Sequence, residues 1–220
     1  RALDQLEAVP IPGTEDARSP FFSPDGAWIG FESRGALKKV ALSGGPPVTV
    51  WDGDRDVGTA SWGDDDTIVF ARLGYGNEIL RMAAAGGVAA PVTTLGSDDA
   101  FHSWPELLPG GTGLLFTVRP HSGDIGTPRI AVKSLETGEQ RVLMEGSMPR
   151  YLRSGHVVFA RQSAVWAAPF DRNRLAVTGD AVRVLEGVAT DSAGLATKFT
   201  VVDHGSLVYL PQVTETRQLV

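Results

Sequence analysis

The sequence lacks cysteine altogether, so disulfide bonds and metal sites built from thiolates are excluded. It also lacks any apolar run of about 18 residues or more, and we therefore expect no membrane insertion through a helix. Basic residues are in deficit, with 20 Lys and Arg against 26 Asp and Glu and a net charge of −6. Sequence-independent binding of nucleic acid needs a basic face, so we expect no nucleic-acid partner.

Motifs of several enzyme classes are missing as well. There is no Gly-rich loop followed by Lys, no His-Arg-Asp and no Asp-Phe-Gly, so the chain cannot phosphorylate on its own. There is no Gly-x-Ser-x-Gly nucleophile elbow, because Gly58 stands one residue too far from Ser61. We therefore expect no enzymatic activity and no cofactor.

Glycine and proline are plentiful, at 26 and 14 of 220 residues, which is typical of many short strands joined by tight turns. Five segments share one pattern: a short strand, a polar turn usually ending in Gly, and a second strand that closes on an aromatic residue. These segments are residues 21–31, 61–70, 107–116, 151–159 and 199–209. In the first turn, Pro24 fixes φ, Asp25 bonds its own backbone and Gly26 supplies a positive φ.

The closing aromatic residues recur at the period of a four-stranded propeller blade. They are Phe31, Phe70, Phe116, Phe159 and Tyr209, separated by 39, 46, 43 and 50 residues. Alternation of apolar and polar residues predicts a third strand at 36–42, 78–84, 129–135 and 164–170, and a fourth at 48–51, 91–95, 140–144 and 182–185. No segment indicates a helix of ten residues or more.

These repeats predict an all-β fold, a β-propeller of about five four-stranded antiparallel blades in a single domain, residues 1–220. We expect blades at about 18–53, 54–97, 98–147, 148–189, and 190–220 together with 1–17.

The last blade takes strands from both chain ends, with residues 217–220 followed in register by the N-terminal segment. Sharing a blade in this way pairs the edges that otherwise invite aggregation. Two alternatives stay open: a slice of a longer propeller, and a blade-swapped oligomer in place of a monomer.

Residues 19–31 resemble the repeat motif of TolB-like propellers, the WD-repeat-like β-propeller family. Residues 3–8, 44–49 and 60–63 resemble, more narrowly, the C-terminal sensor-type propellers of bacterial serine/threonine protein kinases. The later turns keep Gly but lose Pro-Asp-Gly. The resemblance covers nearly the whole chain and implies a binding or scaffolding module, with any kinase activity in a part outside it.

The segments that lead into the first strands predict a weak ligand site. Arg18, His102, Arg150 and Lys198 occupy equivalent places in four repeats. Cations that converge at one mouth of a central channel attract an anion or an acidic peptide. The alternative is ordinary surface charge, paired with nearby carboxylates.

A second weak candidate is a calcium site. Asp52, Asp54 and Asp56 alternate as the ligands at the start of a calcium loop do. The continuation fails, because Val57 stands where the loop needs Gly and Gly63 where it needs Glu. A solvated loop between blades explains the pattern better, and we expect no metal.

The sequence therefore favours a non-catalytic propeller that binds a protein, a peptide or a small anionic ligand on one face. On this interpretation it is a sensor or interaction module of a larger bacterial protein, with an extracytoplasmic or periplasmic location favoured over the cytoplasm. Two other functions stay open: an accessory propeller of a hydrolase or peptidase, and a hydrolase with its site in the channel.

Overall fold

A computed structural model describes residues 9–53, 55–121, 127–191, 196–202 and 205–212. Its strands form five antiparallel sheets, and the described residues include no helix. Accordingly, none of the described residues belongs to a helix long and apolar enough to cross a membrane.

The sheets follow one another in chain order. The first contains β1 (Arg18–Phe22), β2 (Trp28–Ser33), β3 (Ala36–Ala41) and β4 (Val48–Asp52), and the second β5 (Val57–Trp62), β6 (Thr67–Arg72), β7 (Ile79–Ala83) and β8 (Ala90–Pro91). The third contains β9 (Asp99–Leu107), β10 (Gly113–Pro120), β11 (Arg129–Ser134) and β12 (Gln140–Glu145). The fourth contains β13 (Ser147–Leu152), β14 (His156–Arg161), β15 (Ala164–Asp171), β16 (Ala176–Val177) and β17 (Val182–Leu185), and the fifth only β18 (Phe199–Val201) and β19 (Leu207–Tyr209).

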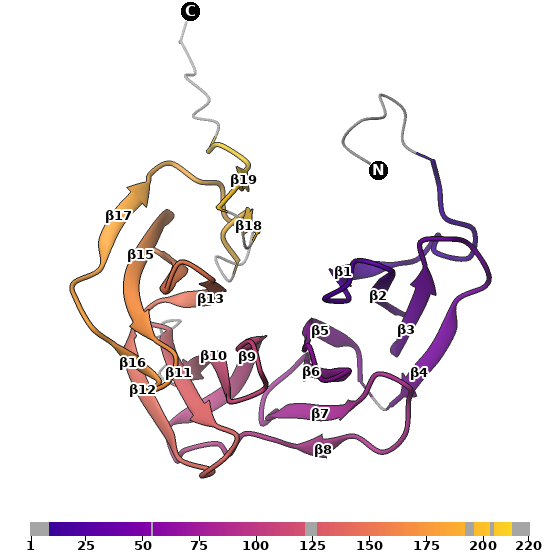
Figure 1. The fold of residues 1–220 in the computed structure, drawn as a ribbon, viewed down its shortest axis with the longest axis horizontal. Helices are drawn as coiled ribbons and strands as arrows, with labels where there is room; N and C mark the ends of the chain where they lie inside the picture. The colour runs from indigo at the N-terminus through magenta and orange to yellow at the C-terminus, as the bar shows by residue number, and fades with distance from the viewer. Residues whose placement is uncertain (1–8, 54, 122–126, 192–195, 203–204, 213–220) are drawn as a thin grey trace, which may run out of the picture.

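Figure 1 shows the sheets arranged around a centre, with the first strand of each sheet innermost and β4, β8, β12 and β17 outermost. This is the blade arrangement of a β-propeller, which confirms the predicted all-β architecture. Four hydrophobic clusters hold the arc together, and each of them lies between two neighbouring sheets. The core is therefore a series of layers between blades.

The predicted hairpins explain these layers. Four of the five closing aromatic side chains are almost completely buried: Phe31, Phe70, Phe116 and Phe159. The fifth differs, because Tyr209 is 41% exposed. It lies on β19, in a sheet with only two strands. Phe70, Phe116 and Phe159 each lie in the cluster shared with the preceding sheet, so this aromatic position fills the layer between two blades.

Closure of the ring differs from the prediction. The described sheets form an open arc (Figure 1), and the described part shows four sheets of four or five strands and one of two, not five complete blades. Residues 217–220 and 1–8, which were expected to share the last blade, lie outside the described residues. Residues 9–17 are described and contain no strand.

Each of three innermost strands carries a β-bulge at a residue that precedes proline. Ser19, Trp104 and Met148 have φ of 49°, 53° and 55°, and the register shifts at the same places. A positive φ is costly for residues other than glycine, so the neighbours must stabilise it. In two of the three the backbone N–H donates to the preceding sheet: Trp104 to Thr59 Oγ1 and Met148 to Thr117 Oγ1, both at 3.0 Å.

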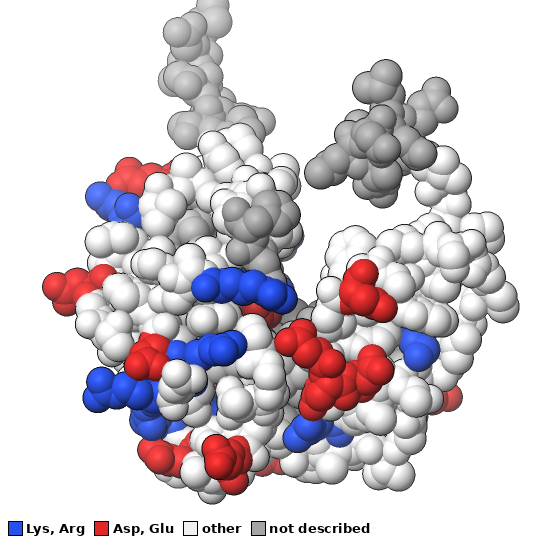
Figure 2. Space-filling model, viewed as in Figure 1, with Lys and Arg blue, Asp and Glu red and all other residues white. Residues whose placement is uncertain are grey.

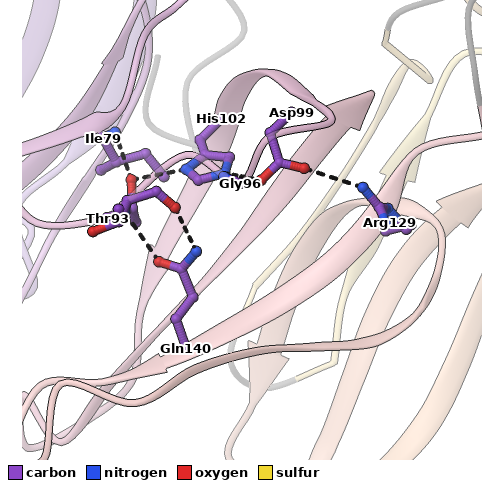
Figure 3. A network of polar contacts seen from close by, with 8 residues as sticks. Ile79, Thr93, Gly96, Asp99, His102, Arg129 and Gln140 are labelled. Carbon is purple, nitrogen blue, oxygen red and sulfur yellow. Dashed lines mark hydrogen bonds and ion pairs between the residues drawn. The ribbon is translucent and has the colours of Figure 1, made fainter. Parts of the chain in front are cut away.

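A buried histidine joins the second sheet to the third (Figure 3). His102 Nδ1 lies 2.9 Å from Thr93 Oγ1, and Nε2 lies 3.3 Å from Asp99 Oδ2. The Asp99 carboxylate only accepts, so His102 Nε2–H donates to it and Nδ1 accepts from the Thr93 hydroxyl, whose oxygen also accepts the N–H of Ile79. That assigns the ring proton to Nε2, which faces a carboxylate that also pairs with Arg129 at 3.1 Å.

Substitution of Thr93 by Val keeps the shape of this side chain and removes its hydroxyl. The Ile79 N–H then loses its acceptor and His102 loses its donor, so we expect the free energy of unfolding to fall by about 1–3 kcal/mol. Urea denaturation followed by tryptophan fluorescence measures the change. Thr49→Val, on an exposed site of β4, is the matched control, with an expected change below about 0.5 kcal/mol. Equal effects of the two substitutions would contradict the assigned role.

The same network predicts a pH dependence of stability. Burial lowers the pKa of His102, and the hydrogen bond and charge of Asp99 oppose that shift without cancelling it. The unfolded chain therefore takes up the proton more readily than the folded one. The contribution of His102 to the free energy of unfolding is therefore fully present above the ordinary histidine pKa, about 6.5. It is lost progressively as the pH falls below that value. We expect this decline to be shallower in His102→Gln and unchanged in His156→Gln, as measured by urea denaturation across that range; equal slopes would exclude His102 as its source.

Candidate functional site

A cavity of about 710 Å³ opens between the first and second sheets. Its walls come from the β1–β2 turn, the β5–β6 turn, Lys39 of β3 and the end of β7. The lining residues are Ser23, Pro24, Asp25, Trp28, Lys39, Trp62, Asp64, Asp65, Asp66, Thr67, Arg81 and Met82 to Ala85. The volume is in the range of pockets that take a small ligand or part of a peptide.

The floor of the cavity is aromatic. Trp28 begins β2 and Trp62 ends β5, so the two indoles come from neighbouring sheets. Phe21 packs on Trp62 with ring centroids 6.2 Å apart, and it lies across the strand from Gly30. A Cβ at Gly30 would collide with the Phe21 ring, so glycine there makes room for the aromatic stack.

Lys39 covers this floor. Its Nζ lies 4.9 Å from the ring centroid of Trp28 and 5.7 Å from that of Trp62, and it donates a hydrogen bond of 2.8 Å to the carbonyl of Ala84. An ammonium over two indole faces is a cation–π arrangement. The floor is thus already suited to a positive charge.

One polar group in the floor has no partner. Trp62 is 9% exposed, and its indole N–H has no hydrogen-bond acceptor among the described residues. A buried donor without an acceptor costs about 1–3 kcal/mol, so such groups point to a water or a ligand.

The rim of the cavity is acidic. Asp65 pairs with Arg81 at 3.1 Å and caps its own turn by accepting the N–H of Thr67. The Ser23 hydroxyl and the Ala27 N–H lower the pKa of Asp25, so that carboxylate is held in its charged form.

Asp64 and Asp66 are exposed. Within the described residues, neither carboxylate has a hydrogen-bond or ion-pair partner. Figure 2 shows acidic side chains gathered over the part of the face where Figure 1 places β1, β2, β5 and β6, whereas most Lys and Arg of that face lie over the other half. The cavity therefore carries an excess of negative charge, because its four carboxylates outnumber its two cations, Lys39 and Arg81.

The four residues of the predicted channel-mouth site are not joined by any described contact. Arg18 and Lys198 are exposed, and Arg150 pairs with Glu106 at 2.6 Å. His102 is fully buried in the network between the second and third sheets, away from an open surface. Anion binding by the other three stays a prediction.

The calcium candidate is described only in part, because Asp54 lies outside the described residues. Asp52 ends β4, and Asp56 directly precedes β5. No group of three or more His, Asp or Glu suited to a metal ion occurs in the portion of the chain that the structure describes.

Sequence reasoning missed the cavity, although it noticed some of its parts. The strand–turn–strand pattern of residues 61–70 places Asp64, Asp65 and Asp66 in its polar turn, in agreement with the structure. The missing information was which turns face each other. Nothing in the sequence distinguishes Lys39 from Lys38, because both have the same charge. Only the strand register decides which of the two faces the cavity.

Comparison with known proteins places the fold. No family model and no curated protein sequence matches the chain. A protein described as TolB from Agrobacterium tumefaciens has a TM-score of 0.64 at 18% identity, covering 78% of this chain and 62% of its own. TolB from Acinetobacter baumannii has a TM-score of 0.55 at 20% identity, covering 68% and 39%. Regucalcin, a calcium-binding protein from Agrobacterium tumefaciens, has a TM-score of 0.64 at 13% identity, covering 89% and 67%.

These likenesses confirm that the fold is a TolB-like β-propeller. At such identities they show the fold alone. The matched chain spans only 62% and 39% of the length of the two TolB proteins.

The contacts of Lys39 predict a measurable contribution to stability. Lys39→Met removes the ammonium from both indoles and its hydrogen bond to Ala84, so we expect the free energy of unfolding to fall by about 1–2 kcal/mol and the tryptophan emission to shift. Lys38→Met is the matched control, because Lys38 is half-buried in the same strand and has no described polar contact. If both variants unfold at the same urea concentration as the wild type, Lys39 does not stabilise the floor.

Proposed function

We propose that this chain is a non-catalytic binding or scaffolding propeller that engages a protein or peptide partner on the face formed by the β1–β2 and β5–β6 turns. The single observation that carries the proposal is the cavity between the first two sheets, with its aromatic floor and charged rim. Aromatic side chains with a few directed polar groups are the usual composition of a recognition site.

The features of an enzyme are weak by comparison. The residues that line the cavity include no histidine. One Ser–His contact occurs in the described part, 3.2 Å between Ser154 Oγ and His156 Nδ1, on an exposed turn. A nucleophile needs its base oriented by a third group, and no described contact supplies one at the other ring nitrogen. The hydrolase alternatives therefore have less support than binding.

The finer interpretation is that the propeller serves as the sensor or interaction module of a larger bacterial protein, such as a serine/threonine kinase. It is supported by the motif resemblance of residues 44–49 and 60–63 and by the lengths of the two TolB proteins, which exceed the matched region. An extracytoplasmic location belongs to the same proposal. The coding sequence on either side of this chain tests it directly: a kinase domain supports the proposal, and a hydrolase domain contradicts it.

The absence of catalysis is tested with a panel of ester, lactone, peptide and glycoside substrates, with and without calcium or manganese. We expect no turnover above that of the urea-unfolded chain. Turnover that survives purification and is abolished by one substitution, such as Ser154→Ala or Asp25→Asn, would establish an enzyme and overturn the proposal.

Binding is tested by selection from a displayed random-peptide library against the folded chain. We expect enrichment of related peptides that lose affinity for a Trp28→Ala variant, while a Trp166→Ala variant, altered in the fourth sheet, keeps it. Circular dichroism checks that both variants fold. Peptides that bind both variants equally well would place the binding face elsewhere.

A further inference from the structure

We propose that the cavity between the first and second sheets selects a basic peptide segment, in which Lys or Arg side chains alternate with apolar ones. This inference rests on the proposed binding function and assigns the chemistry of its partner.

The charge of the rim favours a basic ligand. The rim carries four carboxylates, at Asp25, Asp64, Asp65 and Asp66. Arg81 is engaged by Asp65, and Lys39 by the Ala84 carbonyl and the indoles. A basic side chain that enters the cavity meets the carboxylates of Asp64 and Asp66, which have no described partner, whereas an anionic ligand meets net repulsion.

The floor of the cavity suits an apolar side chain. Trp28, Met82 and the Ala83–Ala85 segment present apolar surface beside the carboxylates, which suits an apolar side chain next to a basic one. Lys39 demonstrates the preference, since an ammonium from this chain already lies over both indoles. Because Lys39 already lies over both indoles, a partner's Lys or Arg is expected to pair with the carboxylates beside the floor, while its apolar neighbours pack on the apolar lining.

The unpaired indole N–H of Trp62 points to a ligand independently of the acidic rim. Trp62 is nine-tenths buried and forms part of the cavity wall. An indole N–H is a donor only, so its missing partner is an acceptor. A peptide provides one in its backbone carbonyl, whereas a simple amine or a metal ion does not; because the N–H is shielded from solvent, the carbonyl reaches it only with a shift of neighbouring side chains. The combination of carboxylates, aromatic floor and orphan donor therefore favours a basic peptide over a free cation.

The test uses fluorescein-labelled short peptides and fluorescence anisotropy with the whole chain. One peptide alternates Lys with Leu, its partner has Glu in place of each Lys, and n-butylamine, which has an ammonium group and no carbonyl, serves as a competitor. We expect saturable binding of the Lys peptide, no binding of the Glu peptide, and weak competition by the small amine. Binding should weaken as salt is raised.

Two variants decide where the peptide binds. Asp64→Asn combined with Asp66→Asn should weaken the Lys peptide about tenfold, since it removes both unpaired carboxylates. Glu136→Gln combined with Asp180→Asn changes the net charge equally at exposed sites outside the cavity and should leave affinity within about a factor of two. If the two double variants weaken binding equally, attraction to overall negative charge explains it and the site assignment is wrong.

Trp62→Phe tests the orphan donor, with circular dichroism confirming the fold. It keeps an aromatic floor and removes the N–H, so we expect several-fold weaker binding of the peptide and no change in the weak competition by n-butylamine. Unchanged peptide affinity would overturn the role of the indole. Failure of every basic peptide, together with enrichment of other sequences in the library selection, would overturn the ligand class and leave the binding function standing.

Discussion

Each sheet of this propeller has two apolar faces and is covered only when the next sheet packs against it. That packing between neighbours is the constraint on which the rest of the structure depends. It explains why Phe70, Phe116 and Phe159 are almost completely buried in successive layers, and why the innermost strands accept bulges with positive φ in order to donate hydrogen bonds to the sheet before. The same constraint creates the candidate site. Two sheets that pack along their strands leave their turns side by side, and the cavity lies between the turns of the first two sheets.

The repeating unit could be predicted from the sequence because it depends on local chemistry. Turn residues such as Pro24 and Gly26 fix the hairpin, and the alternation along the second strand fixes which side chains face the neighbouring sheet. The bulges could not be predicted, because Pro beside Trp104 or Met148 indicates an irregular strand without saying that φ is positive. The buried role of His102 could not be predicted either. Its hydrogen bond to Thr93, nine positions earlier, leaves no sequence pattern that distinguishes it from a surface histidine. The candidate site needs the relative position of two repeats, which no repeat encodes by itself.

The end of the described arc shows what happens where the constraint is not met. The fifth sheet has two strands, and on and after β19 Val208 and Leu210 remain 66% and 60% exposed. A two-stranded sheet is at most marginally stable in water without a further strand or a packing partner. Whatever completes the ring must therefore cover β19 and pair its free edge.

The cavity between the first two sheets has the opposite charge to the channel-mouth site that the sequence predicts, and anion binding at that mouth stays a prediction. The cations near the first strands predict attraction for anions. Arg150, however, forms an ion pair of 2.6 Å with Glu106, which largely neutralises its charge. The carboxylates of the β5–β6 turn show the opposite pattern, since only Asp65 of the three has a described basic partner. A binding surface is defined by the charges left over after internal pairing, not by the charges that the sequence contains. By that measure the face over the first two sheets is acidic, and the cation that already lies on its aromatic floor, Lys39, belongs to the protein itself.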